Sequence, residues 1–250
     1  MASLWTEMTK IGVPELKRHP KTIGSMGNCL QPNEPECNNI PRATSITVDT
    51  TPIKERNVPI IFLLGGPGAG KRTLCTKVAE KYDFLDIISS DLIRQEISKR
   101  TERAFTLARL MSQGRLVPTN VLLELIASKM LNNLSNKNGV IMSGFPRQKD
   151  QCRIFERHVR PPDLVLYLNV RNSVLSDRIM GRMVTITESP LIHYEDIRKQ
   201  IREFHKRNRP IRKYYKKVLV IIDGESDPIN VYEEACEAID NVLMRRMSNT

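Results

Sequence analysis

The sequence predicts an α/β fold in which a parallel sheet is covered by helices on both faces. Short apolar runs, typical of buried strands, alternate along the chain with stretches that have helical spacing. The first of these runs ends at glycines, and a lysine and a helical stretch follow directly. A chain of 250 residues is long enough to bury a sizeable core in one such domain.

The expected strands are runs rich in Ile, Leu and Val. They cover residues 59–64 (PIIFLL), 139–143 (GVIMS), 163–170 (DLVLYLNV) and 217–223 (KVLVIID). The spacing of apolar residues predicts helices over 71–82, 91–99, 102–113, 119–136, 171–181, 194–208 and 229–245. Because strands and helices alternate, the strands are expected to be parallel and joined by helical crossovers.

Residues 1–55 differ in composition from the rest of the chain. They contain six prolines and many Asn, Thr and Lys residues, without sustained periodicity. We expect them to form a disordered N-terminal extension, and residues 56–250 to form the folded domain. The extension does not indicate what its partner is.

The cysteines and the apolar residues indicate a cytoplasmic protein. The five cysteines are widely scattered, and no two have the C-x-x-C spacing, which favours reduced thiols over disulfides or zinc ligands. No run of eighteen apolar residues occurs, so no membrane-spanning segment is expected. The first twenty residues lack the apolar core of a secretory signal.

The glycine-rich segment GGPGAGKRT at residues 65–73 satisfies the pattern G-x-x-x-x-G-K through Gly65, Gly70 and Lys71. In this motif, backbone N–H groups and a helix N-terminus bind phosphate oxygens, and the lysine adds a positive charge. The expected strand before the segment and the helix after it supply the context that the motif requires. We therefore expect a P-loop that binds a nucleotide. The position after the lysine, which holds a Mg²⁺-binding hydroxyl in the general motif, is Arg72.

The net charge of +11 is concentrated in residues 198–217, which hold ten basic residues and one acidic residue. A nucleic-acid-binding surface is one interpretation of this segment, and a solvated helix near the phosphate site is the other. Aromatic residues make up only 5% of the chain, which leaves few platforms for stacking bases. The composition therefore favours the solvated helix.

Further motifs follow the P-loop in a fixed order. They are SSDLIRQEI (89–97), QGRLVP (113–118), SGFPRQKDQ (143–151), DRIMGR (177–182) and DGESDPINVYEEACEAID (223–240). Together with GGPGAGKRTLC (65–75), they resemble the motifs of adenylate kinases, which transfer a phosphoryl group between ATP and AMP. The resemblance covers about residues 57–246. It implies a P-loop NTPase-type sheet flanked by helices, an NMP-binding insertion at about 88–118 and a degenerate short lid at about 182–193.

The resemblance also assigns roles to single residues. It implies ATP binding by Gly66, Gly68, Ala69, Gly70, Lys71, Arg72 and Thr73. It implies AMP binding by Ser89, Arg94, Val117, Gly144, Arg147 and Gln151, and glutamine at the last position favours adenine over a pyrimidine. It places the catalytic charges on Lys71, Arg178 and Arg182. Mg²⁺ as cofactor and a monomeric state are further implications.

The sequence departs from the family pattern at four places. Arg72 stands where the family has glycine, and Ser143 stands where it has an aspartate that holds the waters of Mg²⁺. Residues 183–193 lack the G-R-x-D-D of the lid, and Gln200 replaces an arginine of the next helix. The first two changes remove an anion from the cation site and add a cation. Weak Mg²⁺ dependence is one interpretation, and an Arg72 side chain that turns outward, with no effect on the metal, is the other.

These departures leave several functions open. An arginine at the transferred phosphate is worth about 10³–10⁵ in rate, so turnover should suffer more than binding. The alternatives to a working adenylate kinase are a nucleotide-binding scaffold without turnover, a UMP/CMP kinase and a nucleic-acid-binding module on the same fold. Gln151 argues against the UMP/CMP kinase.

Overall fold

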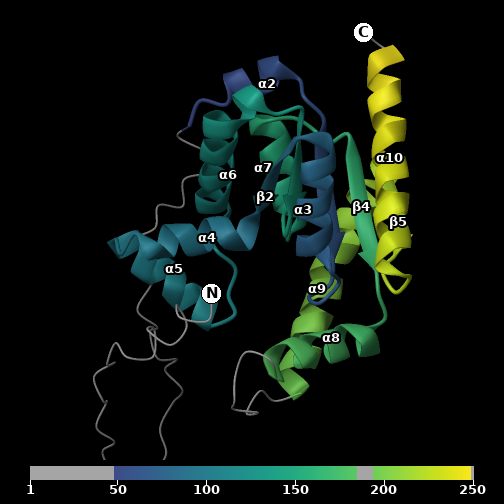
Figure 1. The fold of residues 1–250 in the computed structure, drawn as a ribbon. Coiled ribbons are helices and arrows are strands. Elements are labelled where there is room, and N and C mark those ends of the chain that lie inside the picture. The colour runs from purple at the N-terminus through teal and green to yellow at the C-terminus, as the bar shows by residue number, and fades with distance from the viewer. Residues whose placement is uncertain (1–47, 185–193, 249–250) are drawn as a thin grey trace, which may run out of the picture. The chain divides into compact units, whose positions relative to one another are not determined.

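The fold is taken from a computed structural model that describes residues 48–184 and 194–248 (Figure 1). Within these residues the chain forms a five-stranded sheet with strand order β2-β3-β1-β4-β5, and every neighbouring pair is parallel. The strands are β1 (Ile60–Gly65), β2 (Phe84–Ile88), β3 (Gly139–Ser143), β4 (Leu164–Asn169) and β5 (Leu219–Asp223). The predicted parallel α/β fold is confirmed.

Helices connect the strands and flank the sheet (Figure 1). They are α2 (Thr51–Arg56), α3 (Lys71–Tyr82), α4 (Ser89–Ser98), α5 (Glu102–Ser112), α6 (Thr119–Asn133), α7 (Lys149–His158), α8 (Asn172–Val184), α9 (Tyr194–Tyr214) and α10 (Pro228–Ser248). In the described ranges, no helix is long and apolar enough to cross a membrane.

The structure adds elements that the sequence pattern did not predict. These are strand β2 and helix α7, and helix α9 continues through Pro210 to Tyr214 instead of ending at residue 208. Helix α2 begins at Thr51, within the range 1–55 that was expected to be a disordered extension. Residues 1–47 and most of the expected lid, residues 185–193, lie outside the described residues.

Strand β1 is buried on both faces of the sheet, which explains its uninterrupted apolar sequence. Ile61 and Leu63 belong to a core cluster that includes buried side chains of α3 and α10. Phe62 points to the opposite face, since successive side chains of a strand alternate. There its ring makes edge-on contacts with Phe155 of α7 and with Tyr215, at centroid distances of 5.3 and 5.7 Å. Helices therefore cover both faces.

The carboxyl ends of the parallel strands meet at one edge of the sheet, and this edge positions the site. The P-loop follows β1 there, and α4 begins where β2 ends. Helices α4 and α5 pack against each other, and α4 also packs against α6. Figure 1 shows α4 and α5 to one side of the sheet. Helix α8 approaches the same edge after β4. Elements distant in sequence therefore enclose one space.

Candidate active site

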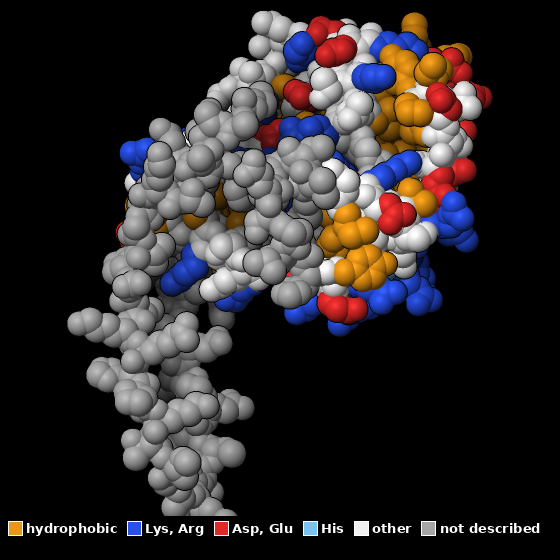
Figure 2. All heavy atoms as spheres, turned by 60° about the horizontal axis from the view of Figure 1, so that its bottom comes forward, with side chains coloured by type: hydrophobic (Ala, Val, Ile, Leu, Met, Phe, Trp, Pro, Cys, Tyr) orange, Lys and Arg blue, Asp and Glu red, His pale blue; other side chains and the backbone are white. Residues whose placement is uncertain are grey.

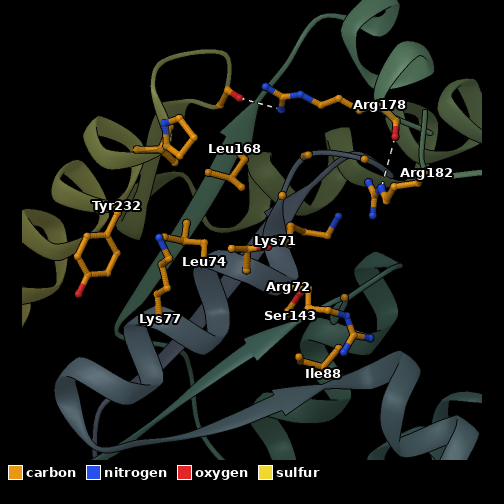
Figure 3. Close-up of a pocket in the computed structure, with 18 of the residues that line it drawn as sticks. Lys71, Arg72, Leu74, Lys77, Ile88, Ser143, Leu168, Arg178, Arg182 and Tyr232 are labelled. Carbon is orange, nitrogen blue, oxygen red and sulfur yellow. Dashed lines mark hydrogen bonds between the residues drawn. The ribbon is translucent and has the colours of Figure 1, made fainter. Parts of the chain in front are cut away.

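A cavity of about 890 Å³ lies at the carboxyl edge of the sheet (Figure 3). This volume is in the range of small-molecule sites. The predicted site residues in its wall are Gly68, Ala69, Gly70, Lys71, Arg72, Thr73, Ser89, Gly144, Arg147, Arg178 and Arg182. Four predicted residues do not line it, namely Gly66, Arg94, Val117 and Gln151. The structure thus brings most of the expected residues together, from four separate motifs.

Several P-loop positions require glycine, either because their φ angle is positive or because a side chain would collide with α8. Gly68 and Gly70 have φ angles of +85° and +88°. A Cβ atom on Gly68 would lie 3.0 Å from the carbonyl oxygen of Leu175 in α8, and one on Gly66 would lie 2.5 Å from its Cδ1. The glycines therefore let the loop pack against α8.

Lys71 is held in the cavity between other positive charges. Its Nζ atom donates a hydrogen bond to the carbonyl of Gly66 at 2.6 Å, and the side chain is half-buried. Burial, together with the nearby charges of Arg147 and Arg182, lowers the pKa of Lys71 to about 8. Anionic phosphate would favour the protonated form of this lysine. The site is therefore built to receive negative charge.

Arg178 and Arg182 lie one turn apart on α8 and both line the cavity (Figure 3). Arg178 Nη1 donates to the carbonyl of Gly224 at 3.0 Å, and Arg182 Nε donates to the carbonyl of Arg178 at 3.4 Å. Residues four apart share a helix face, as the sequence spacing predicted. Their side chains reach the same cavity as Lys71.

Four of the six candidate AMP residues, all except Arg94 and Val117, meet at the turn after β3. Ser89 Oγ and Arg147 Nε both donate hydrogen bonds to the carbonyl of Gly144, at 2.9 and 3.0 Å. The backbone N–H of Arg147 donates to Gln151 Oε1 at 2.7 Å. Gln151 is buried behind the cavity wall, where its Nε2 lies 3.5 Å from Thr119 Oγ1. In this structure Gln151 therefore supports the loop that carries Arg147.

Arg72 makes a two-point ion pair with Asp91 at the start of α4. The Nη1–Oδ2 and Nη2–Oδ1 distances are both 2.5 Å, and Asp91 Oδ1 also lies 2.9 Å from Arg94 Nη1. The hydrogen bonds from Arg72 are the main cause of a lowered pKa for Asp91. In Figure 3 the Arg72 side chain points to the side of the cavity where Ser143 lies, away from Arg178. Arg72 is thus part of the cavity wall.

The donor groups of the cavity do not fit a Mg²⁺ ion held by the protein. The described residues that line it include no Asp, Glu or His, and six of them are Lys or Arg. Mg²⁺ in nucleotide sites is bound through one or two carboxylates in addition to phosphates. Position 143 offers a neutral hydroxyl, and both oxygens of Asp91 already bind arginines. No cluster of three or more metal-ligand side chains occurs in the described ranges.

Sequence reasoning missed part of the cavity wall beside α10. The additional residues include Lys77, Ser226, Pro228, Val231 and Tyr232. Lys77 Nζ lies 5.9 Å from the centroid of the Tyr232 ring. Most of these residues fall in the quoted motif 223–240, but its pattern did not indicate which of them face the cavity.

Arg207 of α9 is a second missed cation. Burial is the main cause of a lowered pKa for Arg147, and the charge of Arg207 is the second cause, so the two arginines lie close together. Arg207 Nη2 also lies 3.1 Å from Glu203 Oε2. Arg207 is seven residues beyond Gln200, which corresponds to about two helical turns and hence the same face. That spacing is the signal that could have identified it.

The basic segment of α9 is largely solvated. Most of its Lys and Arg side chains are exposed, and ion pairs join Arg198 to Glu195 and Arg207 to Glu203. On the described part of the surface as a whole, Lys and Arg side chains are interspersed with acidic and apolar ones (Figure 2). The segment thus has the character of a charged helix surface.

Comparisons with known proteins agree with this geometry. A family model described as adenylate kinase matches residues 63–220. Adenylate kinase isoenzyme 5 of Mus musculus is 33% identical over 190 residues, 75% of this chain but only 34% of that protein. Adenylate kinase 1 of Drosophila melanogaster is 32% identical over 194 residues, covering 77% of this chain and 85% of the relative. For adenylate kinase isoenzyme 1 of Rattus norvegicus the identity is 30% over 191 residues, with coverages of 76% and 98%. The chain therefore belongs to the adenylate kinase family.

Proposed function

We propose that this protein binds ATP and AMP and interconverts them with two ADP, at a rate well below that of a complete adenylate kinase site. The observation that supports this most directly is the convergence of Lys71, Arg147 and Arg182. All three side chains line the same cavity, and the two arginines are close enough to lower the pKa of the lysine. Such a cluster suits ligands that bring several phosphate groups into one cavity.

In the proposed reaction an oxygen of the AMP phosphate attacks the γ-phosphorus of ATP in line. A P–O bond forms to AMP while the bond from the γ-phosphorus to the bridging oxygen breaks, and both products are ADP. No covalent intermediate is needed, because positioning and charge stabilisation dominate phosphoryl transfer. Lys71, Arg178 and Arg182 would bind the ATP phosphates, and Arg147 the AMP phosphate.

Turnover should be slow because parts of the charge-stabilising apparatus are absent from the sequence. Gln200 replaces an arginine, and an arginine at the transferred group is worth about 10³–10⁵ in rate. Adenylate kinases generally use Mg²⁺ with ATP, whereas the donor groups of this cavity do not fit the ion. A scaffold that binds nucleotides without turnover is therefore the second candidate.

Initial rates of ADP formation test the proposed reaction. We expect slow turnover with ATP and AMP, and slower turnover with ATP and UMP or CMP. Turnover should also rise at least tenfold in the variant R72G/S143D/Q200R, which restores three residues of the family pattern. ATP binding without turnover in either protein would favour the scaffold. Faster reaction with UMP or CMP would overturn the assignment of AMP.

The control is the same set of assays with Lys71→Met in both backgrounds. Lys71 carries the charge that the P-loop motif requires, so turnover should be lost in each case. Activity that survives this substitution would come from a contaminating kinase.

A further inference from the structure

We propose that Arg72, held by Asp91, takes over the charge role of Mg²⁺, so that this site binds the metal-free nucleoside triphosphate. The inference rests on the proposed nucleotide site and adds the ionic form of the ligand. It concerns the one P-loop side chain that departs from the family pattern.

The first step is the position of Arg72. It directly follows Lys71 at the start of α3 and lines the same cavity. Its side chain is 54% exposed, so a ligand in the cavity can reach it. It also points toward the side where Ser143 lies (Figure 3). A guanidinium thus lies at the part of the loop where the general motif places its metal.

The second step is the way in which Asp91 fixes the guanidinium. The two-point pair joins Arg72 of α3 to the first turn of α4. Each hydrogen bond uses one N–H group, and an arginine has five such donors in a planar fork. Asp91 can therefore orient the guanidinium while its three other N–H groups stay available to phosphate oxygens of a ligand. A fixed cation loses less conformational entropy on binding than a free side chain.

The third step is the charge of the cavity as a whole. Among the described residues, its wall carries six Lys and Arg side chains and no carboxylate. The six are Lys71, Arg72, Lys77, Arg147, Arg178 and Arg182. A divalent ion at the loop would lie near several fixed positive charges, and the carboxylate beside the loop, Asp91, is already paired with Arg72 and Arg94. Metal-free triphosphate, which carries more negative charge than its Mg²⁺ complex, suits this wall better.

A plain surface ion pair is the competing interpretation of Arg72 and Asp91. Exposed pairs of this kind contribute little to stability, and such a pair would have no effect on a ligand. The two interpretations differ in one measurable quantity, the affinity for ATP without metal when Arg72 is removed.

Calorimetric titration of the full-length protein with ATP, in EDTA and in Mg²⁺, provides the test. We expect the wild-type dissociation constant in EDTA to be equal to or lower than that in Mg²⁺. Arg72→Ala should raise the dissociation constant for metal-free ATP about 10- to 100-fold, the range for hydrogen bonds to charged groups. The affinity in Mg²⁺ should change less.

Arg202→Ala is the matched control, because it removes one exposed guanidinium from α9 outside the cavity wall. It should leave both affinities within a factor of two of wild type. Thermal unfolding of both variants checks that they are folded, which is expected for exposed positions.

The outcomes separate this inference from the proposed function. If Mg²⁺ tightens ATP binding tenfold or more, or if Arg72→Ala leaves the metal-free affinity unchanged, Arg72 does not replace the metal, although the nucleotide site stands. If ATP produces neither heat nor a thermal shift in either buffer, the nucleotide site itself is wrong and the inference is overturned with it.

Discussion

Lys71 is placed to bind an anionic ligand, and its position lowers the stability of the folded protein. The folded protein places its ammonium group in a partly buried position near Arg147 and Arg182, and lowers its pKa from an ordinary value near 10.5 to about 8. Keeping this lysine charged therefore costs folding free energy. Replacing Lys71 by methionine, a side chain of similar length without charge, should remove this cost.

We expect Lys71→Met to abolish ATP binding and to raise the free energy of unfolding at pH 7 by about 1–3 kcal/mol. The gain should be complete below pH 8, where both states of the wild type are protonated. It should shrink as the pH rises from 8 to about 10.5, because the folded wild type then loses its proton first. Urea unfolding at pH 7 and pH 9.5 measures both effects.

Lys77→Met is the matched control for this prediction, because Lys77 lies on the same helix and lines the same cavity but is exposed. It should change the free energy of unfolding by less than about 0.5 kcal/mol, as is usual for surface positions. Equal effects of the two substitutions would show that the environment of Lys71 is not special.

Nucleotide binding should also return a proton to the protein. At pH 8.5 part of the Lys71 population is neutral in the free protein, and phosphate favours the charged form. We therefore expect proton uptake on ATP binding. Calorimetry at pH 8.5 in buffers with different ionisation enthalpies measures it as a buffer-dependent heat. This dependence should be weaker at pH 7, where Lys71 is already protonated.

At the scale of the element, the junction of β3 and α4 depends on one glycine. Gly144 has a φ angle of +79°, and a Cβ atom there would lie 2.5 Å from Ser89 Oγ. Gly114, after α5, has a φ angle of +66° but no atom within 4 Å of such a Cβ. The two glycines share a backbone conformation and differ in their surroundings.

We expect Gly144→Ala to reduce the free energy of unfolding by about 2–4 kcal/mol, combining backbone strain with overpacking. Gly114→Ala should cost only the strain, about 1–2 kcal/mol. Urea unfolding of the two variants compares them. Equal losses would mean that Ser89 moves aside readily and that the close approach is unimportant.

Strands and helices whose apolar residues follow an uninterrupted periodic pattern could be predicted from the sequence. The elements that were missed or ended at the wrong residue lack such a pattern. β2 was missed because Asp86 interrupts a short apolar run that follows α3 after one residue. Helix α7 was missed because it begins inside the motif 143–151 and its sequence KDQCRIFERH has only three apolar residues, too few to show helical spacing. The Pro210 ring, which normally ends a helix, is exposed within α9 and does not end it.

The site could be predicted as a set of residues but not in its pairings. The P-loop pattern indicated Lys71, and the resemblance to adenylate kinases implied Arg147 and Arg178. The pairing of Arg72 with Asp91 joins residues nineteen positions apart, and only the arrangement of α3 and α4 brings them together. The sequence alone left open whether Arg72 points outward.

At the scale of the whole molecule, the cavity joins two groups of residues on different elements. Arg178 and Arg182 of α8 lie on the side of the P-loop that we assign to ATP. Arg147 lies in the turn after β3, and Ser89, at the start of α4, is bonded to that turn. Because one continuous cavity contains both groups, a ligand that carries two nucleosides on one phosphate chain should bind across it. Such a ligand makes the contacts of both sites but loses its translational freedom only once, whereas two separate nucleotides lose it twice.

We therefore expect a dinucleoside polyphosphate, with two adenosines joined by five phosphates, to stabilise the protein more than ATP or AMP alone. A ligand at a hundred times its dissociation constant stabilises the folded state by about 2.7 kcal/mol. For a domain of this size that corresponds to a rise in Tm of roughly 5–10 °C. Thermal scans at equal ligand concentrations, in EDTA and in Mg²⁺, measure the shift, and Lys71→Met should remove it. A shift no larger than that of ATP would mean that the cavity holds one nucleotide, and the proposed transfer between two bound nucleotides would then have no structural basis.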